Sequence, residues 1–147
     1  MGESLKSFEE LECWKACRKV HTYVRKLTKK YPAEEKYDLV DNMKRAARSA
    51  SRNIAEGFGR YSFQENIKHC IISRGSLFEL IDDLITSDEE LYITKAEFHE
   101  ARKLIDRAAA LVNGYIHYLY NAKIESSKVK EESAPYSIAG SRITDNK

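Results

Sequence analysis

The stretch SASRNIAEGFGRYS, residues 49–62, contains the end of one expected helix and the beginning of the next. Small and apolar residues recur at helical spacing up to Ile54 and Gly57, and the Gly57-Phe58-Gly59 run then interrupts the pattern. Ser62 opens a new S-x-x-E capping box that ends at Glu65. These residues predict two helices joined by a tight reversal, with small side chains that allow close packing where the chain turns.

Three more apolar patterns extend outward from this stretch. They run from Leu11 to Tyr31 behind the capping box Ser7–Glu10, from Phe63 to about Thr86, and from Phe98 to Leu119 behind a Thr94–Glu97 box. With the pattern from Leu39 to Gly57, they predict four helices of roughly 24 residues joined by short connections. The expected fold is all-α, an antiparallel up-down-up-down four-helix bundle.

The C-terminal region differs from the rest of the chain. No hydrophobic periodicity follows residue 126, and the segment is rich in polar and charged residues. We therefore expect a bundle domain over residues 1–125 and a disordered tail over residues 126–147.

Composition limits the class of protein. The chain has 147 residues, 42% of them hydrophobic, which suits one domain with a sizeable core. No apolar run approaches the roughly 20 residues of a membrane span, and no signal peptide is recognisable. Three cysteines without disulfide-framework spacing are typical of reduced thiols. We expect a cytoplasmic protein with no membrane partner.

Arginines follow the outer side of the second expected helix. At 100° per residue, Arg45, Arg48 and Arg52 lie almost opposite the apolar stripe, and Arg60 and Lys68 lie near the following turn. The net charge of only +2 is far from that of a dedicated nucleic-acid module, so local density has to supply any phosphate binding. These five residues are the candidate nucleic-acid-binding site, and an ordinary solvated helix surface is the competing interpretation.

Charges also gather in two longer blocks. Residues 15–30 carry seven basic residues and no acidic one, and residues 79–90 carry six acidic residues and no basic one. In the expected bundle both blocks lie at the same end, so they can pair within one chain or across a subunit boundary. Weak surface pairing is the alternative.

The third expected helix has an apolar arc about half a turn wide, more than one core face needs. The excess suggests an oligomer interface. Arg74 falls inside this arc, and we expect a structural ion pair for it.

Enzyme chemistry finds little support in the sequence. Cys13, Cys17 and His21 cannot all bind one zinc ion, because residues eight apart on a helix are about 12 Å apart. No Glu-x-x-His pair, H-E-x-x-H motif or P-loop is present. We expect no metal, no cofactor and no catalytic residues, with the four histidines as ordinary surface or boundary residues.

Several segments together resemble a known family. FEELECWKA, MKRAARSASRNIAEGFGRYS and SRGSLFELIDDL are similar to segments of the intervening-sequence proteins of 23S rRNA genes, which are bacterial four-helix bundles. The family is in turn similar to the accessory proteins of diversity-generating retroelements. The resemblance implies a homo-oligomer, with a pentamer expected, and nucleic-acid binding without established catalysis. The motif residues carried over by this resemblance are Asn53, Glu56, Gly57, Arg60, Arg74, Gly75, Ser76 and Glu79.

This chain departs from its relatives at two positions. Asn66 and His69 stand where relatives commonly have large aromatic or apolar residues.

Two functional hypotheses follow. The first is a non-enzymatic oligomer that binds the RNA or DNA backbone through clustered Arg and Lys. The alternative is a protein-interaction scaffold that docks a partner such as a reverse transcriptase, without direct nucleic-acid binding.

Overall fold

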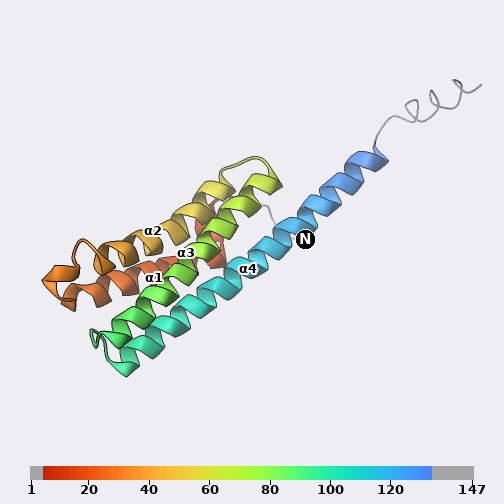
Figure 1. Ribbon diagram of the computed structural model, residues 1–147. Helices are drawn as coiled ribbons and strands as arrows, with labels where there is room; N and C mark the ends of the chain where they lie inside the picture. The colour runs from red at the N-terminus through yellow and green to blue at the C-terminus, as the bar shows by residue number, and fades with distance from the viewer. Residues whose placement is uncertain (1–4, 134–147) are drawn as a thin grey trace, which may run out of the picture.

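The computed structural model describes residues 5–133, and four long helices make up most of this range (Figure 1). They are α1 (Glu12–Leu27), α2 (Leu39–Phe58), α3 (Phe63–Glu89) and α4 (Lys95–Glu132). Short 3-10 turns occupy Phe8–Glu10, Thr28–Lys30 and Ala33–Glu35. Consecutive helices run in opposite directions beside one another, so the predicted antiparallel four-helix bundle is confirmed.

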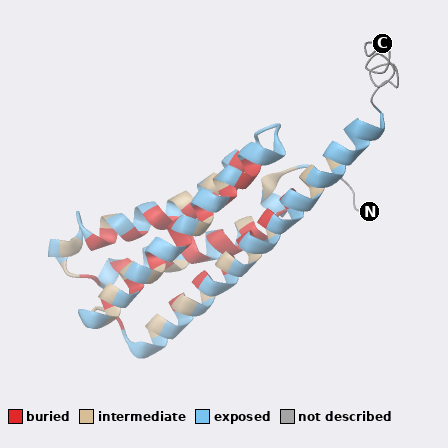
Figure 2. Cartoon of the chain, turned by 45° about the vertical axis from the view of Figure 1, so that its right-hand side comes forward, coloured by how far each residue is buried: buried red, intermediate tan, exposed pale blue. Residues whose placement is uncertain are grey.

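Each helix turns one side toward a common core, which runs along the inside of the bundle (Figure 2). The fully buried side chains include Val20 from α1, Met43 from α2, Leu80 from α3 and Val112 from α4. Helix α2 packs against α1 and α3, and α4 packs against the same two helices. The helices α1 and α3 therefore lie on a diagonal of the bundle, with their outer sides facing away from each other.

The helix starts follow the sequence signals in two of three cases. The Ser62 hydroxyl accepts a hydrogen bond from the Glu65 amide at 3.1 Å, and Thr94 and Glu97 form the full reciprocal capping box. The capping box predicted for the first helix is wrong, because Ser7 caps the 3-10 turn Phe8–Glu10 instead. Leu11 is extended and buried, and this break in the backbone delays the start of α1 to Glu12.

Helix α4 is longer than expected. It continues through Glu132, so residues 126–132, which we expected to belong to a disordered tail, are helical. Its last turns extend beyond the other three helices (Figure 1), where no core packing imposes an apolar period on the sequence. The rest of the predicted tail, residues 134–147, lies outside the described residues. Within residues 5–133, no helix combines the length and apolar character that a membrane span needs.

Helices α2 and α3 approach each other closely at Gly57. A Cβ atom added to this glycine would lie 2.7 Å from Asn66 Oδ1, 3.0 Å from His69 Cβ and 3.1 Å from the Asn66 carbonyl oxygen. Contacts this short leave no room for any side chain. Gly57 therefore sets the distance between the two helices, directly before the turn that reverses the chain.

A matched pair of glycine substitutions tests this contact. We expect Gly57→Ala to lower the free energy of unfolding by about 1–3 kcal/mol, because overpacking forces the backbone of α3 to shift. Gly75 also lies within a helix, but an added Cβ would meet nothing within 4 Å, so Gly75→Ala should raise stability by about 0.5–1 kcal/mol. Urea denaturation monitored by circular dichroism measures both, and equal effects of the two substitutions would contradict the close approach.

Candidate nucleic-acid interface

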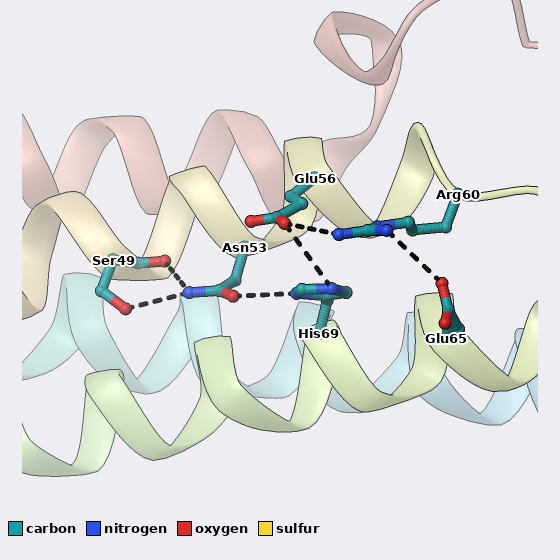
Figure 3. A network of polar contacts seen from close by, with 6 residues as sticks. All are labelled: Ser49, Asn53, Glu56, Arg60, Glu65 and His69. Atoms are coloured by element: carbon teal, nitrogen blue, oxygen red, sulfur yellow. Dashed lines mark hydrogen bonds and ion pairs between the residues drawn. The ribbon is translucent and has the colours of Figure 1, made fainter.

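A chain of polar contacts joins α2 to α3 next to Gly57 (Figure 3). Asn53 donates to the Ser49 carbonyl at 2.9 Å, and its Oδ1 atom lies 3.1 Å from His69 Nδ1 on α3. His69 Nε2 lies 3.9 Å from a Glu56 carboxylate oxygen, which also accepts a 3.0 Å bond from Arg60. The Asn53 contact gives the half-buried imidazole a hydrogen-bond partner, and the Glu56 and Arg60 contacts connect the helix seam to the turn.

The remaining family-motif residues lie further along α3. Ser76 donates to the Ser49 hydroxyl at 2.8 Å and extends the polar chain along α3, whereas Gly75 and Glu79 are exposed. The expected ion pair of Arg74 is wrong, because its guanidinium donates to the amide oxygen of Asn113 on α4 at 2.8 Å. An amide is sufficient here because Arg74 is only half-buried and keeps part of its hydration.

The two residues that depart from the family pattern are part of the same seam. Asn66 is buried and donates to the Tyr115 hydroxyl on α4 at 3.2 Å, and His69 lies between Asn53 and Glu56. Both polar side chains therefore have partners. This arrangement is structural, and it fixes the register of α2 against α3.

The five predicted nucleic-acid-binding residues do not form one patch. All are exposed, as predicted, but Arg45 is held by Asp41 at 3.0 Å and Asn42 at 2.7 Å. Arg60 is held by Glu56 at 3.0 Å and lies 3.8 Å from Glu65. Lys68 lies on α3 and not on α2. Arg48 and Arg52 remain together on the side of α2 that faces α1.

Arg48 and Arg52 meet two arginines of α1 across a groove, which we call the arginine groove. It contains about 410 Å³ and is lined by Phe8, Trp14, Arg18, His21, Arg25, Arg48, Ser51, Arg52 and Ala55. No acidic residue lines it, and its four arginines form no ion pair with any residue between 5 and 133. Four arginines that form no ion pair within the described residues thus line one concave surface.

His21 lies in the wall of the arginine groove and reports its electrostatic field. The side chain is buried, with 8% exposed, so the prediction of an ordinary surface or boundary histidine is wrong for this residue. Burial, followed by the charges of Arg18, Arg25 and Arg48, lowers the pKa of His21 below its usual 6.5. The neutral imidazole is therefore favoured beside the arginines.

A second groove, between α2 and α3, has the opposite character. Its lining includes Arg45 together with Glu79, Asp82 and Asp83. Burial, then the charges of Asp82 and Glu79, raises the pKa of Asp83 to about 6. The bundle thus separates its charges, with a positive groove on one side of α2 and an acidic groove on the other.

The three cysteines are buried thiols in the core. Burial raises the pKa of Cys13 to about 11 and that of Cys17 to about 12, so neither is an activated nucleophile. Among the residues described, no group of three His, Cys, Asp or Glu side chains is arranged to hold a metal ion.

Arg18 and Arg25 are the residues that sequence reasoning missed. They belong to the basic block of residues 15–30, and their seven-residue spacing places them on one face of α1. This spacing was the signal available in the sequence. The sequence does not show which side of α2 faces α1, so it could not show that these two arginines meet those of α2.

Comparison with known proteins identifies the family. Residues 9–114 match the family described as 23S rRNA-intervening sequence protein. The chain belongs to this family. In this member, the match includes the four arginines of the groove and the whole seam between α2 and α3, and it ends before the last turns of α4. A search of curated proteins gives no match.

The field in the arginine groove can be measured at His21. By NMR, we expect the His21 ring to titrate below pH 6.5 and its midpoint to rise as salt screens the neighbouring arginines. Because the unfolded state then binds more protons, His21 should also lower stability as pH falls below 6.5. A midpoint at or above 6.5 in low salt would contradict this description of the groove.

Proposed function

We propose that this protein is a non-enzymatic, cytoplasmic homo-oligomer that binds the backbone of RNA or DNA through the arginine groove. The observation that carries the proposal is the convergence of Arg18, Arg25, Arg48 and Arg52 on a groove without acidic residues. Guanidinium groups bind phosphates through paired hydrogen bonds and cannot lose their charge at neutral pH. A phosphate in the groove would also relieve the repulsion among the four cations.

The net charge of +2 does not argue against this site. Many of the acids lie elsewhere, including those of the groove between α2 and α3, so the average over the chain conceals a local positive field. Phosphate contacts of this kind position a nucleic acid without reading its sequence.

The outer side of α3 supports self-association. Ile71, Phe78 and Ile85 recur every seven residues on this helix and remain 40–58% exposed. Acids accompany them there, whereas the outer side of α1, diagonally opposite, is basic. Complementary surfaces that face opposite ways favour head-to-tail contacts, which close into rings when the rotation allows. A five-subunit ring is the arrangement that the family resemblance implies.

Assembly into an oligomer would strengthen the nucleic-acid binding that a single arginine groove provides. Each subunit of a ring contributes one arginine groove, and a nucleic acid bound at one of them meets the next at high effective concentration.

Charge reversal tests the groove. We expect Arg48→Glu with Arg52→Glu to weaken binding of a fluorescein-labelled oligonucleotide by about tenfold or more per arginine, since charged hydrogen bonds are lost. Fluorescence anisotropy over a range of salt concentrations should also show a shallower salt dependence, by roughly one unit of slope per lost phosphate contact.

The matched control is Arg45→Glu with Arg102→Glu. It changes the net charge equally, but both arginines already pair with aspartates on their own helices. Equal losses in the two double variants would show that general charge, not the groove, governs binding. If the wild-type chain shows no salt-sensitive binding and retains a protein partner after nuclease treatment, the scaffold hypothesis is the better one.

Substitution of an exposed aromatic residue on α3 tests whether this helix forms the oligomer interface. Phe78→Ser should convert the assembly to smaller species in light scattering with little loss of helicity, because the side chain is 58% exposed. Tyr37→Ser is the control, since Tyr37 is 84% exposed and lies in the connection between α1 and α2. An unchanged mass for the Phe78 variant would place the interface elsewhere.

A further inference from the structure

The arginine groove has an aromatic end that phosphate binding alone does not use. The Arg18 guanidinium lies over the Trp14 ring, with its central carbon 5.8 Å from the ring centroid. Phe8 and Trp14 pack in an edge-to-face arrangement, with 5.3 Å between ring centroids and 67° between ring planes. Phe8 thus packs against the indole of Trp14, and the indole in turn packs against the exposed side chain of Arg18.

We propose that the arginine groove selects single-stranded nucleic acid, with an unpaired base stacked on the Arg18 guanidinium that covers Trp14. The proposal rests on the proposed function and names its substrate class. Unstacked bases stack on aromatic rings and on guanidinium planes. In a duplex the bases already stack on one another, so a duplex reaches the arginines with its phosphates alone.

The dimensions of the groove suit a short stretch of one strand. Arg18 and Arg25 are seven residues apart on α1, which corresponds to about 10 Å along the helix. Each strand of a stacked duplex carries a phosphate about every 3.4 Å along the axis, and an unstacked single strand is more extended, so the groove spans at most about three nucleotides. Its volume of about 410 Å³ is within the range of small-ligand pockets, which is enough for one splayed base with its sugar and phosphate.

The charge and the stacking plane of Arg18 can be separated by one conservative change. Arg18→Lys keeps the positive charge but removes the planar guanidinium. Arg25→Lys is the matched control, because Arg25 lines the same groove and has no aromatic ring beneath it in the described chain.

The experiment measures affinity of the full-length chain for a labelled 12-nucleotide oligothymidine and for a 12-base-pair duplex at one salt concentration. We expect Arg18→Lys to weaken single-strand binding about fivefold or more beyond its effect on duplex binding, because the duplex loses only a paired phosphate contact whereas the single strand also loses the stacking plane. Arg25→Lys should weaken both affinities by similar factors.

Trp14 provides a second readout, because it is the only tryptophan in the chain. Its fluorescence should change when the single strand binds and remain constant when the duplex binds. The proposal is overturned if Arg18→Lys and Arg25→Lys have the same effect on both probes, or if both probes change the fluorescence equally. In those cases salt-sensitive binding persists and the proposed function stands. If the wild-type chain binds neither probe, the proposed function is wrong, and this proposal is wrong with it.

Discussion

The structure depends above all on the close approach of α2 and α3 at Gly57. The absence of a side chain there allows Asn66 and His69 to lie directly against the α2 backbone. This contact fixes both the spacing and the rotation of α2 just before the turn. With that rotation set, the apolar side of α2 enters the core, and Arg48 and Arg52 face α1.

The polar seam beside Gly57 gives this contact its specificity. A half-buried polar side chain is costly to dehydrate unless it has a hydrogen-bond partner. Here Asn53 on α2 is the partner of the His69 ring, with the Glu56 carboxylate nearby, and Asn66 donates to Tyr115 on α4. A slip of one helical residue would leave several polar groups unpaired, so the seam favours a single register.

Charge separation across the bundle explains how a nearly neutral chain can present a strongly positive groove. Helix α2 is the divider: its arginines face α1 on one side, and its other side meets the acidic residues of α3. Two titratable side chains respond to these opposing electrostatic fields: the pKa of His21 is lowered in the positive groove, and the pKa of Asp83 is raised in the acidic groove. Each follows from burial combined with neighbours of like charge.

The sequence by itself determined the four helices, their order and the turn between Phe58 and Phe63, because helical periodicity, caps and glycines act over a few residues. It also placed Arg48 and Arg52 on the outer side of α2. It did not predict the partners of these arginines, since Arg18 and Arg25 are more than twenty positions away and join them only when α1 packs against α2. The pairs of Arg45 with Asp41 and of Arg60 with Glu56 are local contacts between residues four apart, so the sequence already contains them. The tertiary structure alone decided that His21 is buried and that Arg74 binds an amide, because both depend on the distance and rotation between helices, which local periodicity does not encode.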